Sequence, residues 1–215
     1  MTQEERQQII NLVKQEVIPA IGCTEPIAVA LCVAKATEVL GCRPEKINVF
    51  LSANILKNAM GVGIPGTGMI GLPIAVALGA LIGKSSYQLE VLKDSTPQAV
   101  EEGKAYLNEK RISIALKDDC TEKLYVEVVC EAGSSHSCAI ISGEHTRFVF
   151  VSKDADVLLK EDVVADASAQ EKTLNLTLHK VYDFALTAPL AEIAFILDTA
   201  KLNKAAAESS FKGNY

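Results

Sequence analysis

Apolar positions recur at helical spacing over the first forty residues of the chain. Thr2 and Glu5 have the spacing of a capping box, which marks the start of a helix. The apolar positions that follow are Ile9, Ile10, Val13 and Val17. Pro19 ends this predicted helix because proline cannot donate the next backbone hydrogen bond. A second, alanine-rich helix is predicted over 24–40, and Gly41 follows it as a typical helix terminator.

After this second helix, apolar and other residues alternate over 47–51, as is typical of a strand. The elements predicted next are a strand over 47–51, a glycine-rich loop over 52–68, a buried helix over 69–82 and a helix near 97–108. From Arg111 to Val151 four strand-like runs follow one another with only short turns between them, which is typical of an antiparallel meander. Two helices divided at Ala188-Pro189 are predicted from about residue 167 onward.

These elements predict an α+β fold class: a mostly antiparallel sheet with buried helices packed against it and helices at both ends. A chain of 215 residues can bury roughly 70% of its unfolded surface, so no disulfides are needed for stability. We expect a single α+β domain over 1–215.

Composition and charge narrow the possible partners. The net charge is −6 and no basic stripe with interleaved aromatics occurs, which argues against a nucleic-acid partner. The apolar stretch over 69–83 is shorter than the roughly 20 residues of a membrane span, so no membrane contact is expected. The polar N-terminus does not have the pattern of a signal peptide, and the six cysteines include no CxxC pair. We therefore expect a cytoplasmic protein with reduced thiols, most of them in the core.

Cys23 has the most distinctive surroundings of the six cysteines. It lies in Gly22-Cys-Thr-Glu-Pro26, directly before a predicted helix start, where the helix dipole and free N–H groups favour a thiolate. A thiolate attacks electrophiles or binds metal, but one cysteine cannot hold a metal alone. On the residues alone, a buried thiol at a helix start remains the alternative.

The glycine-rich loop over 52–68 is the second candidate for chemistry. Its glycines permit close backbone approach, and N–H groups exposed there could cradle a carboxylate or a phosphate. Lys57 adds a positive charge, while Asn54 and Asn58 add hydrogen-bonding groups. The alternative is a mobile surface loop, although the alternation of glycine with Met, Val and Ile argues against it.

The segment Gly61–Gly66 also matches the dinucleotide fingerprint GxGxxG. That fingerprint should join a strand directly to a helix, yet about ten residues separate it from the predicted strand over 47–51. Pro65 also removes one N–H beside the supposed phosphate turn. A dinucleotide-binding domain is therefore the lesser alternative.

Histidine offers the remaining candidate for a site. His136, near Cys138 on a predicted strand, is expected to be a surface residue, and His179 a structural residue on a helix. His145 opens the last predicted strand after a turn, where its side chain could face a site.

Several of these blocks together resemble the L-cysteine desulfidase family, a relative of the iron–sulfur L-serine dehydratases. The blocks are Gly22–Pro26, Leu56–Asn58, Pro65–Met69, Gly71–Pro73, Leu89–Asp94 and Phe195–Asn203, in this order over essentially the whole chain. The resemblance implies that the chain is the N-terminal half of a larger cytoplasmic lyase, and that a C-terminal helical half is absent from it.

The resemblance also implies a [4Fe–4S] cluster in the complete protein, held by three cysteines with one iron open to substrate. Cys23 is its implied N-terminal ligand, and the other two ligands lie in the absent half. The open iron acts as a Lewis acid when sulfide leaves L-cysteine, or water leaves L-serine, to give pyruvate and ammonia. The general base is not identified, and the chain alone is expected to bind no cluster and to be inactive.

A small amino-acid substrate is implied for the glycine-rich loop. The implied substrate-binding residues are Asn54, Lys57, Asn58, Gly66, Thr67, Gly68 and His145. Arg147 departs from the residue expected after the His145-Thr146 pair, so His145 is the weakest match.

Two classes of function stay open. The first is a lyase half or separate subunit that works with a C-terminal half or partner subunit, and a homodimer is one arrangement that stays open for it. The second is a non-catalytic amino-acid-binding or regulatory module of the same fold.

Overall fold

The computed structural model describes residues 1–161 and 175–213, and the chain folds into two compact units. One unit comprises 20–163, and the other comprises 1–19 together with 164–215. The predicted single domain over 1–215 stays a prediction. Among the described residues, no helix has both the length and the apolar character that a membrane span requires.

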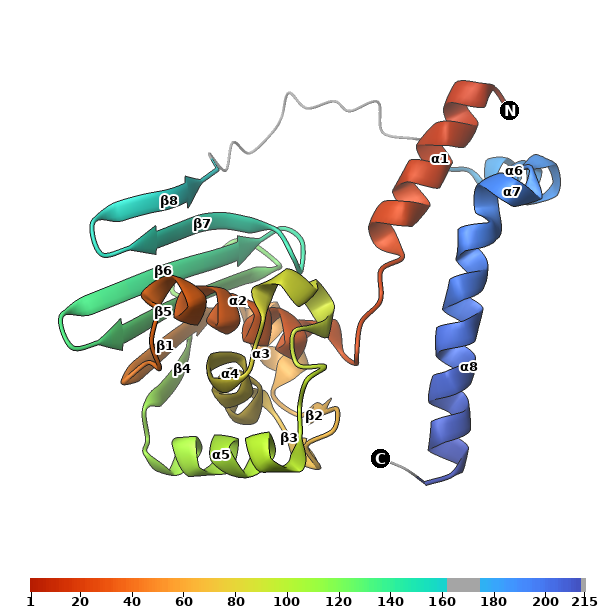
Figure 1. The fold of residues 1–215 in the computed structure, drawn as a ribbon. Coiled ribbons are helices and arrows are strands. Elements are labelled where there is room, and N and C mark those ends of the chain that lie inside the picture. Colours follow the sequence, from red (N-terminus) through yellow and green to blue (C-terminus); the bar gives the residue numbers. More distant parts are fainter. Residues whose placement is uncertain (162–174, 214–215) are drawn as a thin grey trace. The chain divides into compact units, whose positions relative to one another are not determined.

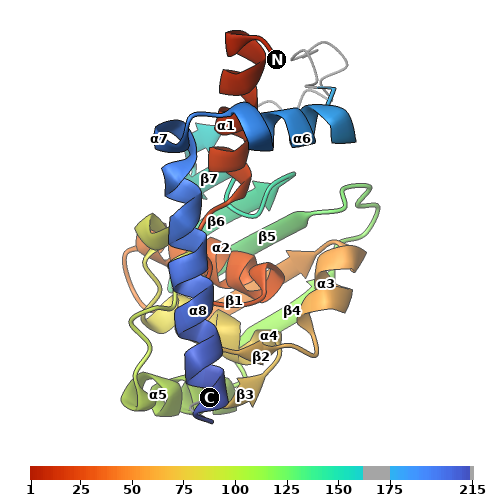
Figure 2. The same cartoon turned by 90° about the vertical axis from the view of Figure 1, so that its right-hand side faces the viewer.

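The 20–163 unit is built on a sheet with the strand order β4-β1-β5-β6-β7-β8. Its strands are β1 (Lys46–Leu51), β4 (Ile112–Leu116), β5 (Tyr125–Ala132), β6 (Ser135–Ser142), β7 (Phe148–Lys153) and β8 (Asp156–Lys160). Its helices are α2 (Thr24–Leu40), α3 (Ala53–Ala59), α4 (Leu72–Leu81), η1 (Ser85–Glu90) and α5 (Pro97–Asn108). Figures 1 and 2 show α2 against one face of this sheet, with α4 packed on α2 and α5 packed on α4. The predicted α+β class with a mostly antiparallel sheet is confirmed.

Alternation along the strands explains which face the helices cover. In β1, Ile47, Val49 and Leu51 are buried, and the residues between them point to the other face. Helix α2 is buried almost throughout its length because it lies between the sheet and α4. It ends at Gly41, whose φ of 84° is the left-handed conformation that glycine adopts most readily. The predicted bounds of α2 and α5 are confirmed.

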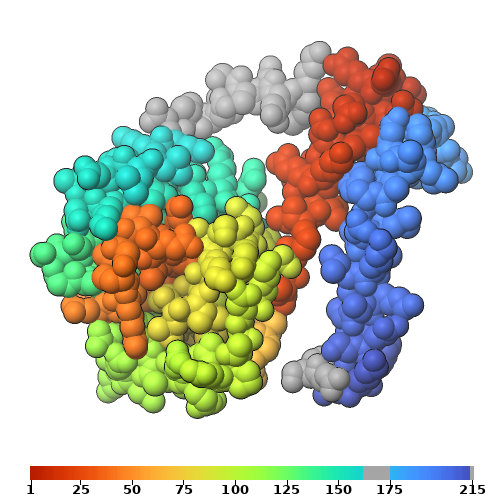
Figure 3. Space-filling model, viewed as in Figure 1, coloured from red at the N-terminus to blue at the C-terminus, as the bar shows by residue number. Residues whose placement is uncertain are grey.

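Helices α2 and α4 approach each other closely at Gly79. A Cβ atom built on Gly79 would lie 2.7 Å from the backbone oxygen of Ala30 and 3.2 Å from Cβ of Val33. Glycine is therefore required here by the neighbouring helix, although it is a poor helix former. Helix α4 is almost entirely buried, and in the space-filling view the yellow-green and green residues that follow it, from η1 to α5, lie on the surface of this unit (Figure 3).

Two predictions about the sheet and one about a helix need correction. Strand β4 is not part of the meander, because it pairs in parallel with β1 while β5 pairs with the other edge of β1. The meander instead runs through β5, β6, β7 and β8, and β8 lies beyond the predicted end at Val151. The buried helix begins at Leu72 rather than Met69, because Met69 and Ile70 form strand β3.

The predicted loop over 52–68 is also wrong in its structure. Its first part is helix α3, which forms because Ile55 and Ala59, four residues apart, are buried on one helix face. Its second part is a hairpin of β2 (Gly63–Ile64) and β3 (Met69–Ile70). The GxGxxG segment thus lies in a turn and a hairpin, outside any strand–helix junction, which contradicts the dinucleotide-binding alternative.

The other unit contains α1 (Gln3–Glu16), α6 (Leu178–Thr187), α7 (Leu190–Ile193), η2 (Ala194–Ile196) and α8 (Leu197–Phe211). The capping box of Thr2 and Glu5 is confirmed, since each side chain accepts a hydrogen bond from the other residue's backbone N–H. Glu5 also forms a 3.0 Å ion pair with Lys180 of α6. The predicted division at Ala188-Pro189 is confirmed, and residues 167–174 of that prediction lie outside the described residues.

Candidate functional site

Cys23 is the residue that precedes helix α2. Its backbone is extended, and its side chain makes no capping hydrogen bond to the helix. Instead, its Sγ donates a hydrogen bond of 2.9 Å to Oε2 of Glu25. The half-buried thiol is therefore held by the first turn of the helix that it precedes.

Glu25 connects the two segments that carry the candidate residues. Its Oε2 also accepts a 3.4 Å hydrogen bond from the Thr24 hydroxyl, and its Oε1 accepts one of 3.2 Å from Nδ2 of Asn58. The hydrogen bond from Cys23, which is the largest cause, and the one from Asn58 hold the pKa of the Glu25 carboxyl below its usual value. Proximity to His145 lowers the same pKa further. Glu25 thus joins the start of α2 to α3 and lies near the β6–β7 turn.

The pKa of the Cys23 thiol is raised above its ordinary value. Partial burial is the largest cause, and the hydrogen bond to Glu25 is the second. The expectation that the helix start favours a thiolate is therefore wrong for the chain as described, because burial and a nearby carboxylate outweigh the helix terminus. Cys23 is a protonated thiol at neutral pH.

The glycine hairpin lies against the start of α2. A Cβ atom on Gly22 would come within 2.7 Å of Cγ of Pro65, so glycine at 22 permits this close contact. Gly66 and Gly68 have φ values of 74° and 63° with open space around them. Their backbone is accessible to a ligand, and side chains at these two positions would be strained.

Thr67 has a structural role within this hairpin. Its buried hydroxyl donates a 2.7 Å hydrogen bond to the carbonyl oxygen of Ile64 and accepts one of 3.0 Å from the N–H of Met69. These bonds fix the turn that carries Gly66 and Gly68.

Helix α3 places the other candidates of this segment on one face. Asn54, Lys57 and Asn58 are separated by three and four residues, the spacing of neighbours on a helix surface. Asn58 is half-buried and points to Glu25, whereas Asn54 and Lys57 are exposed. In the part of the chain that the structure describes, Lys57 forms no ion pair and its charge is available to a ligand.

The three histidines lie in different surroundings. His145 lies half-buried in the β6–β7 turn, close enough to Glu25 to influence its pKa. His136 is exposed, with Nδ1 3.5 Å from Asp154, and His179 is exposed on α6. Of the residues predicted for the site, the structure thus brings Cys23, Asn58 and His145 together around Glu25.

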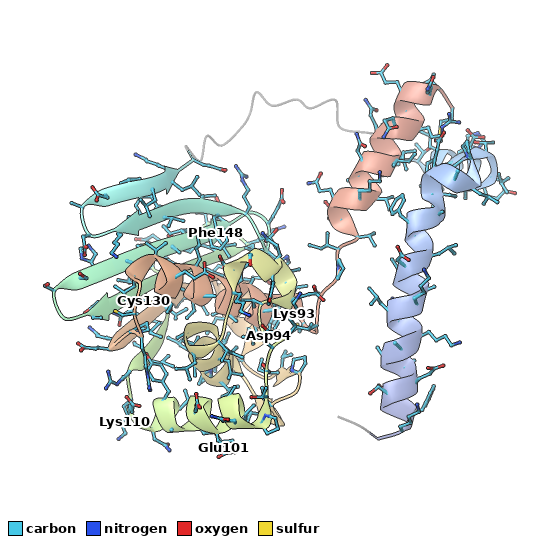
Figure 4. The ribbon with its side chains drawn as sticks, viewed as in Figure 1. Lys93, Asp94, Glu101, Lys110, Cys130 and Phe148 are labelled. Atoms are coloured by element: carbon cyan, nitrogen blue, oxygen red, sulfur yellow. The ribbon has the colours of Figure 1, made fainter. Side chains whose placement is uncertain are left out.

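Of the five remaining cysteines, Cys32 and Cys130 are buried and Cys120 and Cys138 are half-buried, so the expected core position holds for two of them. Burial raises the pKa of Cys130 to about 12 and that of Cys138 to about 11, and Cys32 is fully buried. Cys130 lies on β5 (Figure 4). Cys42 is exposed, which contradicts its expected core position. Across residues 1–161 and 175–213, no three His, Cys, Asp or Glu side chains are grouped to hold a metal ion.

Glu25 is the residue of this cluster that sequence reasoning did not single out. The available signal was its position in the first turn of the helix after Cys23, two residues along the chain. Its contact with Asn58, thirty-three residues away, depends on how α3 packs on α2 and has no local signature.

Substituting Glu25 with glutamine is expected to lower the pKa of Cys23. Glutamine removes the negative charge that helps to keep the thiol protonated, so Cys23 should react faster with iodoacetamide at pH 8. The measurement is the pH dependence of alkylation of the Cys23 peptide by mass spectrometry. Glu101→Gln, on exposed α5, is the control and should leave this rate unchanged. Equal or slower alkylation in Glu25→Gln would show that Glu25 does not set the thiol's pKa.

Comparison with known proteins finds similar proteins whose names state no activity. The chain is 73% identical to a UPF0597 protein of Bacteroides fragilis and 68% identical to one of Bacteroides thetaiotaomicron, each over all 215 residues. It is 41% identical over 207 residues to a UPF0597 protein of Aeromonas hydrophila. The chain spans about half the length of these relatives, at 50%, 50% and 47%. No protein-family model and no solved structure matches it.

Proposed function

We propose that this chain is one half, or a separate subunit, of an iron–sulfur-dependent amino-acid lyase. Its match to about half the length of UPF0597 proteins supports its assignment as one half. The lyase activity is proposed from the sequence blocks that resemble the L-cysteine desulfidase family. The complete lyase eliminates sulfide from L-cysteine, or water from L-serine, to give pyruvate and ammonia. The observation that carries this proposal is that Cys23 and Asn58, from two separate segments, both donate hydrogen bonds to Glu25. His145, from a third segment, lies close enough to lower the pKa of the Glu25 carboxyl.

The residues of the described chain fit one ligand position of a [4Fe–4S] cluster. Such clusters are held by cysteine thiolates, and Cys23 offers a sulfur at a helix start. Oε2 of Glu25, 2.9 Å from Sγ, is placed to accept the thiol proton when Cys23 becomes a ligand. The other two ligands are assigned to the half of the protein that this chain does not span.

The hairpin and α3 supply the substrate side of the proposed site. Lys57 offers an exposed positive charge, and the N–H groups near Gly66 and Gly68 offer donors for the α-carboxylate of the amino acid. Asn54 and Asn58 add donors from the same helix face. A bound cluster would supply Lewis-acid chemistry at the leaving sulfur or oxygen.

Substituting Lys57 with alanine in the complete protein is expected to weaken substrate binding. A charge-assisted hydrogen bond contributes about 1.5–3 kcal/mol, so the Michaelis constant should rise roughly ten- to a hundredfold. Pyruvate release against L-cysteine and L-serine concentration measures this effect. Lys104→Ala, which removes a similar charge from exposed α5, serves as the control. An unchanged Michaelis constant in Lys57→Ala would rule out this role for α3.

The protonated state of Cys23 favours a second candidate, an amino-acid-binding or regulatory module without a metal. Anaerobic reconstitution of the complete protein with iron and sulfide separates the two. Iron uptake with pyruvate release supports the lyase. Calorimetric binding of L-cysteine or L-serine that needs no iron, with no pyruvate formed, supports the binding module.

A further inference from the structure

Helix α6 carries apolar side chains on two different faces. One face packs on α1, where Phe184 and Ala188 form a small buried cluster with Ile9 and Ile10. The second face, which we call the outer face of α6, is formed by Leu178, Val181, Tyr182 and Leu186, with exposed fractions of 91%, 49%, 65% and 68%. At 100° per residue these four side chains lie within about 140° of the helix circumference, and no charged residue falls among them.

Beyond α6, Ile193 and Phe195 pack on this buried cluster, but several other apolar side chains of the described helices are exposed. Helix α8 has fifteen residues and none of them is buried. Its apolar side chains include Leu197, Leu202 and Phe211, with exposed fractions of 64%, 57% and 90%, and Leu190 of α7 is 81% exposed. An isolated helix of this length is only marginally stable in water, so α8 needs a packing partner to stay folded.

The buried cluster of this unit is too small for its apolar burial to offset the entropy cost of ordering these helices. Within 1–19 and the described residues from 175 onward, the buried apolar cluster contains Ile9, Ile10, Phe184 and Ala188. Full burial of a large apolar side chain contributes about 1.5–3 kcal/mol, whereas ordering one backbone residue costs about 1–2 kcal/mol. Exposed apolar surface of this extent usually marks an interaction site.

We propose that the remaining half of the UPF0597 length packs on the outer face of α6 and around α8, whose exposed Leu197, Leu202 and Phe211 lie on different sides of that helix. The relatives are about twice as long as this chain, so their other half provides about as many residues again. Its docking would bury the outer face and give α8 a packing partner. This docking surface rests on one part of the proposed function, namely that the chain works together with this other half.

The test measures association in the absence of iron. The chain is co-expressed with a polypeptide that spans the remaining half of the Bacteroides fragilis relative, and the dissociation constant of the pair is measured by calorimetry. The triple variant Leu178→Ser/Tyr182→Ser/Leu186→Ser should bind about a hundredfold more weakly. The matched control Val157→Ser/Leu158→Ser removes side chains that are 56% and 60% exposed on β8, and it should bind as the unchanged chain does.

Hydrogen exchange on the unchanged chain gives a readout that does not depend on the folding of a variant. The amides of α6 and α8 should exchange more slowly once the other half is added. Equal binding of the triple variant, or equal exchange in the free chain and the complex, would overturn the proposal. Self-association of the chain that the triple variant abolishes would assign the surface to a second copy instead.

Two further outcomes separate this proposal from the proposed function. A complex that the triple variant weakens, but that takes up no cluster on reconstitution, supports the docking surface and contradicts the lyase. A cluster that assembles while the triple variant binds normally supports the lyase and contradicts the docking surface.

Discussion

Substituting Cys23 with serine is expected to leave the complete two-part protein without its iron–sulfur cluster. Serine keeps the size of the side chain but removes the thiolate, and a cluster with one of three ligands lost does not persist in water. The expected result after anaerobic reconstitution is a colourless protein that releases no pyruvate. Iron and acid-labile sulfide per protein are the primary measurements, because they report the cluster directly.

Two controls limit the interpretation of this loss. Cys42→Ser removes an exposed thiol and should keep full cluster content. Cys32→Ser removes a buried thiol that contacts the carbonyl oxygen of Ala139 at 3.2 Å, so it should lower stability without removing iron. Full cluster content in Cys23→Ser would show that the ligand assignment is wrong. The chain alone should stay colourless, and a cluster bound to it would mean that its other cysteines supply ligands.

Placing valine at Gly79 is expected to destabilise the 20–163 unit by about 3 kcal/mol. Even one added carbon would meet the backbone oxygen of Ala30 at 2.7 Å, and backbone cannot move aside as a flexible side chain can. Helix propensity alone predicts that the substitution stabilises the protein, since glycine is the poorer helix former by up to about 1 kcal/mol. Gly79→Ala should therefore also destabilise, by a smaller amount.

The measurement is urea unfolding followed by far-ultraviolet circular dichroism, because the chain contains no tryptophan. Gly61→Val is the matched control, since nothing lies within 4 Å of a Cβ atom at Gly61. It should change the free energy of unfolding by less than about 0.5 kcal/mol. A Gly79→Ala protein more stable than the parent would show that α2 and α4 do not pack as closely as described.

The elements with strong local signals were predictable from the sequence. The capping box of Thr2 and Glu5, and Gly41 at the end of α2, depend on residues a few positions apart and were placed correctly. Helix α3 was not, because its seven residues are stabilised by packing on α2 and have little periodicity of their own. Strand β4 was assigned to the wrong neighbour because pairing order depends on contacts between distant segments.

The residue types of the candidate site were predictable from the sequence, but the contacts between them were not. Its residue types were recognisable as separate blocks, and Cys23 stood out through its position before a helix. The hydrogen bond from Asn58 to Glu25 arises only after α3 has packed on α2, and the pKa of the Cys23 thiol is raised mainly by burial, which also requires the folded chain. A pKa depends on burial and on charges brought together by folding, and neither can be derived from the neighbouring residues in the sequence alone.

The position of β1 in the sheet has a consequence during protein synthesis. Strand β1 lies between β4 and β5, and both of these neighbours are translated later, β5 ending at Ala132. At about 5–20 residues per second, a ribosome needs roughly 4–16 s to complete β5 after β1 has been made. Until β4 has been made, β1 has no strand to pair with, and until β5 has been made its second edge stays unpaired. The nascent chain is therefore expected to bind chaperones most strongly before Ala132 emerges, and less once β5 has paired.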